Sequence, residues 1–237
     1  VIIITTKSGQ KGPKSKVSFS SSLLFEKPLR LVDYQNAFGQ GIYGDAVLYE
    51  NMSWGPAFDY RFRPWGHEVD NTVRVKAYQP LPDNVREFFE TGRSISNSLS
   101  LSGGSEQTTY YFSYSNINWD GIFPLEADTY NKHAVSLRSS HKIASWLKTS
   151  ASFNYIRKKN SFVPTGQGEQ SVYNMIMQTP RDISLLELAD LDETYNTTDN
   201  HYSLYTINPY YILANNGNRN QEDRLYGSFD MQMDIFK

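Results

Sequence analysis

The stretch ISNSLSLSGGSEQTTYYFSYS, residues 95–115, decides the fold. In its first half, Leu99 and Leu101 alternate with serines at each even position from 96 to 102. In its second half, aromatic residues at 110, 112 and 114 alternate with polar or smaller ones, except for Tyr111. A period of two is that of a β-strand, and the Gly103–Glu106 segment between the halves is a short turn. Residues 95–115 therefore predict a β-hairpin.

The same alternation recurs along the chain and predicts six strands. They lie near residues 16–25, 95–102, 108–119, 131–142, 147–157 and 224–236. Each strand has one apolar or aromatic face and one face of Ser, Asn, Asp, Lys or Arg. Before them, Val1–Thr6 is a continuous β-branched run that predicts a strand buried on both faces.

The connections between the predicted strands alternate in length. The second and third strands, and the fourth and fifth, are joined by a few residues, whereas residues 26–93 and 158–223 form two long connections. A compact soluble domain rarely has such long loops, but outer-membrane barrels have short turns at one end and long loops at the other. The long connections also predict short helices, one with Asn84 as N-cap, Glu87 in a capping box and Gly92 as its stop, and one near residues 170–178.

We therefore predict an all-β fold: a transmembrane antiparallel β-barrel with long extracellular loops that carry short helices. The side chains expected to face lipid are Phe19, Leu99, Tyr110, Phe112, Tyr114, Leu137, Phe153, Phe229 and Met231. Those expected to face the lumen are Ser18, Ser100, Ser113, Arg138, Lys148, Asn154 and Asp230. Six strands would leave two open edges in lipid, so we expect further strands from sequence outside this chain, about 22 in all as in large plugged barrels.

Composition excludes several other classes. The net charge of −2 and pI of about 6.1 argue against a nucleic-acid partner. The absence of cysteine excludes a disulfide scaffold and a thiolate zinc site. No apolar run is long enough for a membrane-spanning helix, and His67, His133, His141 and His201 lack metal-ligand spacing. We expect no enzyme activity and no cofactor.

Two other motifs have alternative interpretations. Residues 39–44 match the dinucleotide fingerprint GxGxxG, but the strand and helix that this motif requires do not flank them, so we interpret them as a glycine-rich loop. The acidic residues Asp190, Asp192, Glu193 and Asp199 lack EF-hand spacing, and we interpret them as a solvated loop, with an external calcium site as the alternative.

Aromatic residues in the long loops are the candidate ligand contacts, because aromatic faces stack on sugar rings. They are Trp54, Tyr60, Trp65, Tyr202, Tyr205, Tyr210 and Tyr211. The competing interpretation is that they pack the loops together or form an interface with a protein partner, where Tyr and Trp are also favoured.

Several segments resemble SusC/RagA-type TonB-dependent transporters of Bacteroidota, in the order that this family has. The segments are Val1–Gly9, Tyr34–Asn36 with Gly39–Gly41, Asp83–Val85 with Phe88-Phe89 and Thr91-Gly92, Leu101–Gly104 with Thr108–Ser113, Asp120–Ile122, Gln178–Asp182, Asn208–Tyr210 and Asp223-Arg224. The resemblance spans nearly the whole chain.

The resemblance implies a division into parts and a function. Residues 1–9 would be the last strand of the plug domain, 10–15 a connector, and 16–237 the N-terminal part of the barrel. The implied activity is energised import of glycan or peptide fragments across the outer membrane of a Gram-negative, Bacteroidota-like cell. The implied partners are the rest of the barrel and plug, a SusD-like surface lipoprotein that acts as a lid, TonB through an upstream segment, and the lipid bilayer.

Two alternatives remain open from the residues. A barrel of this kind is also suited to a structural or assembly role in a larger outer-membrane complex. The alternating strands alone also fit a soluble β-rich carbohydrate-binding or adhesin module.

Overall fold

The computed structural model describes residues 7, 9 and 12–235 of the chain. Its main feature is a six-stranded antiparallel sheet in the order β1-β4-β5-β6-β7-β8. The strands are β1 (Gly12–Glu26), β4 (Gly92–Gly104), β5 (Thr108–Asp120), β6 (Thr129–Ala144), β7 (Leu147–Phe162) and β8 (Asn218–Met233). All six predicted strands are therefore present, and each neighbouring pair is antiparallel. The predicted N-terminal strand at residues 1–6 lies outside the described residues.

The strands differ from the predicted ones mainly at their ends. β1 begins at Gly12, inside the segment 10–15 expected to be a connector, and its register with β4 shifts between Gly12 and Lys16. β7 continues to Phe162, and β8 begins at Asn218, because the polar residues at these ends still pair with each other. The sequence pattern underestimated the strands here, since alternation disappears where both faces are polar.

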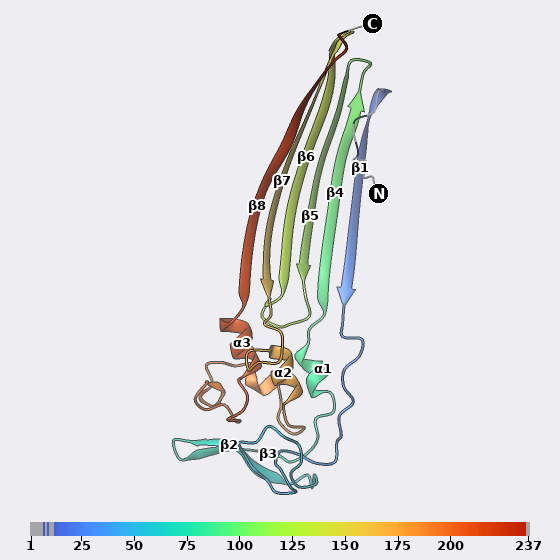
Figure 1. Ribbon diagram of the computed structural model, residues 1–237. Helices are drawn as coiled ribbons and strands as arrows, with labels where there is room; N and C mark the ends of the chain where they lie inside the picture. Colours follow the sequence, from blue (N-terminus) through green and yellow to red (C-terminus); the bar gives the residue numbers. More distant parts are fainter. Residues whose placement is uncertain (1–6, 8, 10–11, 236–237) are drawn as a thin grey trace.

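The long and short connections lie at opposite ends of the sheet (Figure 1). The turns between β4 and β5 and between β6 and β7 are at one end, and the two long connections fold together at the other. We call these two connections, residues 27–91 and 163–217, the loop body. The β5–β6 connection, at the same end, places Leu125 and Glu126 at φ values of 64° and 50°, two successive residues in the left-handed region.

The loop body contains more regular structure than the sequence predicted. A hairpin of β2 (Phe62–Val69) and β3 (Thr72–Ala77) was missed, and so was α3 (Pro209–Asn215). The expected helix near residues 170–178 is present as α2 (Val172–Met177), capped by Ser171, and a 3₁₀ turn, η1 (Leu186–Leu188), follows. A second such turn is η2 (Thr194–Asn196).

The prediction for α1 (Asn84–Phe88) was right about the helix and wrong about its cap. Asp83 occupies the N-cap position without a side-chain hydrogen bond, and the helix ends before Gly92, which begins β4. Asn84 is buried, and its side chain bonds the backbone of Ile183 and Leu185 in the other long connection. Asn84 therefore makes tertiary hydrogen bonds in place of the N-cap hydrogen bond that the sequence predicted.

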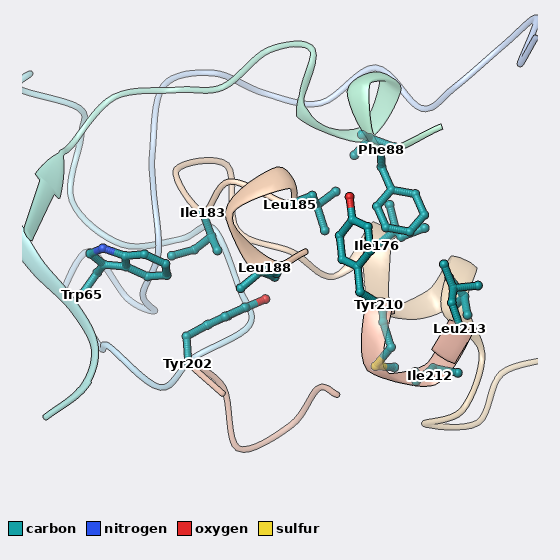
Figure 2. Packing of buried hydrophobic residues seen from close by; sticks show 13 residues of the cluster. Trp65, Phe88, Ile176, Ile183, Leu185, Leu188, Tyr202, Tyr210, Ile212 and Leu213 are labelled. Atoms are coloured by element: carbon teal, nitrogen blue, oxygen red, sulfur yellow. The ribbon is translucent and has the colours of Figure 1, made fainter. Parts of the chain in front are cut away.

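The buried core of the described residues lies in the loop body and not on the sheet. It joins Phe88 and Val85 of α1 to α2, α3 and the segment around Ile183–Leu188, with Tyr202 and Trp65 at its other end (Figure 2). Phe88 packs on Tyr210 with ring centroids 5.0 Å apart. Within the described residues, no helix is long and apolar enough to cross a membrane.

Candidate functional site

One face of the sheet carries the side chains predicted to meet lipid. Across the strands, Phe19 pairs with Leu99 and Leu99 with Tyr114, and the next row joins Phe112, Leu137 and Phe153. Tyr110, Phe229 and Met231 share this face by alternation. Many of these side chains have no cover: Phe19 and Phe229 are each 68% exposed. A large exposed apolar surface of this kind marks a site of contact with a protein, a membrane or a ligand.

The apolar side chains form a band that runs obliquely across the strands. On β1 the outward apolar positions extend from Val17 to Phe25 around Ser21, and on β8 from Leu225 to Met233 around Phe229. Ser21, the middle of the band on β1, lies in the row of paired residues that reaches β8 at Asp223. The middle of the band on β8 is Phe229, which lies six residues, or about 20 Å, closer to the short turns than Asp223 does. Five strand spacings amount to about 24 Å, so the band makes an angle of about 40° with the rows of paired residues.

Tyrosines mark the edge of the band on the side of the loop body. Tyr114 forms a 2.8 Å hydrogen bond with Nδ1 of His133, and the Tyr155 hydroxyl donates to Asp223 over 2.6 Å. His133 and Asp223 belong to the next row on the same face, which is polar throughout. That row consists of Ser21, Asn97, Asn116, His133, Arg157 and Asp223. These tyrosines have their rings in an apolar row and their hydroxyls against a polar row. Such an arrangement is suited to a boundary between apolar and aqueous surroundings.

The opposite face carries the side chains predicted to meet a lumen. Ser18, Ser100, Ser113 and Asn154 lie in one continuous row, with Asn154 accepting a 2.8 Å hydrogen bond from Ser136. Arg138, Lys148 and Asp230 share this face by alternation. A hollow of about 470 Å³ lies along it, lined among others by Arg138, Asn154 and Asp230.

The N-terminal segment touches this polar face. The Arg138 guanidinium donates a hydrogen bond to the Lys7 carbonyl over 2.5 Å. Gly9 lies so close to the backbone of Tyr110 that a Cβ there would come within 2.4 Å of it. Lys7 and Gly9 therefore lie against the polar face, where a side chain at position 9 has no room.

Arg181 holds the two long connections together. Its guanidinium donates to the carbonyls of Gln35, Leu81 and Pro82 and to the side chain of Asn36 over 2.9–3.3 Å. The residue is 2% exposed, and burial lowers the pKa of its guanidinium from the ordinary value. Five possible donors in a planar fork make arginine the residue that can satisfy so many acceptors at once. The sequence motif Gln178–Asp182 thus has a structural role in this fold.

The neighbouring Asp182 forms a buried ion pair with Lys76 of β3. The ammonium nitrogen lies 2.6 Å from the carboxylate and 2.5 Å from the Asp182 carbonyl oxygen. The other carboxylate oxygen accepts a hydrogen bond from the Gln40 backbone over 2.8 Å. Burial lowers the pKa of Lys76 to about 8, although Asp182 acts in the opposite direction. The pair attaches hairpin β2–β3 and the glycine-rich loop to the second long connection.

A second cation of the hairpin, Arg74, is enclosed by aromatic rings. Its guanidinium carbon lies 3.6 Å from the centroid of Trp65 and 4.6 Å from that of Tyr195. Nη1 donates to Asn196, whereas the buried Nε and Nη2 have no hydrogen-bond partner among the described residues. Stacking on two rings replaces part of the lost hydration of the cation.

A cavity of about 290 Å³ lies beside this arrangement. It is lined by Gln40, Ala46, Leu48, Arg63, Pro64, Trp65, Lys76, Tyr78 and Asp182. Its walls are mainly apolar, with the Lys76–Asp182 pair and Arg63 as the charged groups, and Arg63 also bonds Asp59 over 2.8 Å. Sequence reasoning named only Trp65 among these residues as a ligand contact, because the folding of residues 40–78 on one another and the approach of Asp182 from the other connection assemble the cavity, and no local pattern does.

The seven aromatic candidates separate into two groups. Trp65, Tyr202 and Tyr210 are buried in the core of the loop body, and Tyr211 is half-buried. Trp54, Tyr60 and Tyr205 are more than half exposed and are free to meet a ligand or a protein. Two further exposed aromatics were missed: Tyr43, which is 92% exposed, and Phe62, which is 78% exposed.

The exposed aromatics come from both long connections, and backbone hydrogen bonds join the segments around them. Trp54 and Gly44 face each other through a 2.8 Å backbone hydrogen bond, and Leu204 donates to the Tyr49 carbonyl. Residues 39–44 form a closed loop here. Gly41 adopts a φ of 138°, and a Cβ there would meet the Asp45 carbonyl at 2.0 Å, so this glycine is required by the loop itself.

The remaining candidates are the histidines and the acidic residues of the second long connection. Among the described residues there is no group of three or more His, Asp or Glu side chains that could hold a metal ion, and the acidic residues from Asp190 to Asp199 are no exception. His133 and His141 lie on β6 and bond Tyr114 and Thr108, and His201 is buried against Tyr202. No protein-family model and no curated protein matches the chain.

Proposed function

We propose that this chain is part of an outer-membrane β-barrel that imports glycan or peptide fragments in a TonB-dependent manner, together with a SusD-like lipoprotein. The oblique apolar band is the observation that carries the membrane part. In a barrel the strands are tilted by about 35–45° from the membrane normal, so a level lipid layer meets paired rows at that angle. The angle of about 40° between the band and the paired rows of this sheet equals that tilt. Nothing in the geometry of a flat soluble sheet requires such an angle.

The height of the apolar band also agrees with a position in an outer membrane. Val17 to Phe25 on β1 and Leu225 to Met233 on β8 each span about 27 Å along the strand. With a tilt of about 40°, each span has a height of about 21 Å, close to the apolar band of about 25 Å in outer-membrane barrels. The two open edges, β1 and β8, would then pair with strands from the rest of the barrel.

The division of roles between the ends and faces of the sheet supports transport. The polar face with its hollow, touched by Lys7 and Gly9, suits a solvated path around a plug. The loop body carries exposed Trp54, Tyr60 and Tyr205, which an external ligand or lipoprotein would be able to meet. The cavity beside Trp65 adds a recess with apolar walls and charges of both signs, a combination suited to one unit of a glycan or peptide.

A pair of variants in the full-length protein tests the membrane part. Leu137→Arg places a cation on the apolar face, whereas Ser136→Arg places the same cation on the polar face one residue away. At the middle of a bilayer the first change costs about 2–4 kcal/mol, so the Leu137 variant should be depleted from the outer-membrane fraction and the Ser136 variant should be retained. Equal retention of both would overturn the membrane assignment.

Transport is tested separately by deletion of the gene in cells. Deletion of the gene should abolish growth on one class of oligosaccharide or peptide and leave growth on monomers intact. A general envelope defect on every carbon source would instead indicate the scaffold role.

A further inference from the structure

A second hollow lies at the loop-body end of β6–β8, on the face that carries the apolar band. It has a volume of about 470 Å³ and is lined by Glu126, Thr129, Asn131, Lys159, Asn160, Ser161, Arg219, Asn220 and Gln221. An adjoining hollow of about 360 Å³ extends it toward the end of α3 and shares Glu126, Ser161 and Arg219. We propose that this hollow binds the phosphate-bearing headgroup of an outer-leaflet glycolipid.

The face is fixed by the register. Lys159 pairs with Gln221, and Ser161 with Arg219, without an irregularity between them and Phe153. By alternation Lys159 and Arg219 therefore point to the same side as Phe153 and Leu225. As diagonal neighbours, they have Cα atoms about 7–8 Å apart, a spacing that one phosphate can bridge.

The charges of the hollow favour an anion. Within the described residues, neither Lys159 nor Arg219 has a carboxylate within 4.0 Å, whereas Arg157, one row closer to the band, lies 3.8 Å from Asp223. Glu126 is the acidic residue of the lining, and it leaves a net charge of +1. Arg and Lys are the side chains that bind phosphate oxygens most strongly, Arg in bidentate geometry.

The rest of the lining is suited to a sugar. Asn160 and Asn220 offer amide donors and acceptors, whereas Asn131 and Gln221 each have one amide hydrogen bond within the sheet and the Thr129 and Ser161 hydroxyls bond each other. These polar side chains contrast with the apolar rows that begin at Tyr155 and Leu225. A ligand with hydroxyl groups, a phosphate and acyl chains would fill the hollow with its polar part and cover the band with its chains.

The height of the hollow fits a headgroup. Lys159 lies beyond Tyr155 by about 14 Å along β7, which is about 10 Å in height for a strand tilt of about 40°. The headgroup layer adds about 5–8 Å to each side of the hydrocarbon core, and long basic side chains reach back toward that core. This assignment rests on the proposed membrane location.

The test uses the full-length protein and a double variant, Lys159→Gln with Arg219→Gln. The matched control is Lys132→Gln with Arg224→Gln, which removes one lysine and one arginine from the opposite face of the sheet, on β6 and β8. Outer-membrane fractionation comes first, since loss of the wild type from that fraction would end the membrane proposal itself. Detergent-purified proteins are then titrated with micelles that contain lipid A, with the same micelles after phosphatase treatment, and with inorganic phosphate.

We expect the wild type and the control to bind lipid A micelles at least tenfold more tightly than the double variant does. The phosphatase-treated micelles should bind all three proteins equally weakly. Equal binding of lipid A by all three proteins, in a wild type that does reach the outer membrane, would overturn this site alone. Displacement of lipid A by inorganic phosphate at similar concentration would overturn the glycolipid assignment in favour of a free anion. Selective loss of a co-purifying lipoprotein from the double variant would overturn it in favour of a protein partner.

Discussion

The ammonium group of Lys76 lies 2.6 Å from the carboxylate of Asp182, in an ion pair whose side chains are 15% and 2% exposed. The pair links β3 in the first long connection to the segment after α2 in the second. Because both charges have lost most of their water, the pair stabilises the loop body only while both partners remain.

Lys76→Met alone should open the contact between hairpin β2–β3 and the second connection. The change leaves the Asp182 carboxylate buried without its cation, at a cost of about 3–5 kcal/mol. Adding Asp182→Asn should restore most of the protection, since the amide oxygen can still accept the Gln40 backbone hydrogen bond. Hydrogen exchange of the loop-body amides measures both effects, and equal loss of protection in the single and double variants would contradict the expectation.

Arg181→Lys should destabilise the same region although it keeps the charge. A lysine cannot reproduce hydrogen bonds to Gln35, Asn36, Leu81 and Pro82 together, and each buried acceptor left without a donor costs about 1–3 kcal/mol. Limited proteolysis of the loop body should become faster by at least tenfold. The control is Arg86→Lys, at an exposed position of α1, and a similar effect there would show that the assay does not report on the Arg181 contacts.

His201 should make the loop body sensitive to acid. Burial, with the nearby Arg74 and His67, lowers the pKa of His201 to about 4 from the ordinary 6.5. As pH falls from 6.5 to 4, the unfolded segment takes up the proton first, so stability is constant above this window and is lost within it. His201→Gln should remove that part of the pH dependence.

The measurement compares hydrogen exchange of the loop body in wild type and His201→Gln at pH 7 and pH 4.5. Between pH 7 and pH 4.5 the wild type should lose more protection than His201→Gln does. His141→Gln on the sheet is the control, and an equal change there would attribute the sensitivity to another group.

Asn84→Ala should separate α1 from the second connection. The side chain donates to the Ile183 carbonyl over 2.7 Å and accepts from the Leu185 amide over 2.8 Å, so its removal leaves two buried backbone groups without partners. We expect a loss of about 2–4 kcal/mol in the opening free energy of this contact, measured by amide exchange of Leu185. Asn215→Ala, whose single side-chain hydrogen bond is exposed, should change it by less than about 0.5 kcal/mol.

The sheet could be predicted from the sequence because its signal is local. Leu99 with Ser100 and Phe153 with Asn154 repeat the same alternation, and antiparallel neighbours joined by short turns fix their own register. Hairpin β2–β3 was missed for a local reason as well. Pro64 argues against a strand, and the indicative signal was the Asp70-Asn71 turn, in which both residues have positive φ values of 51° and 59°.

The contacts of the loop body could not be predicted in the same way. Lys76 and Asp182 are separated by 106 positions, and neither the charge nor the spacing of either one identifies the other. The aromatic residues illustrate the same limit: Tyr202 and Tyr205 are three residues apart, yet one is 1% exposed and the other 53%. Only the packing of two distant connections decides which ring is buried and which is free.

The attachment of one long connection to the other also has a consequence for the order of assembly. The Arg181 backbone bonds Ser53 across 128 residues of chain, and its guanidinium bonds Leu81 across 100. Closing loops of that length against chain entropy is unfavourable until strand pairing has shortened them. The strands between these contacts must therefore pair first, and the two long connections pack together last. A folding intermediate that accumulates late would have a complete sheet and long connections that proteases can still cleave.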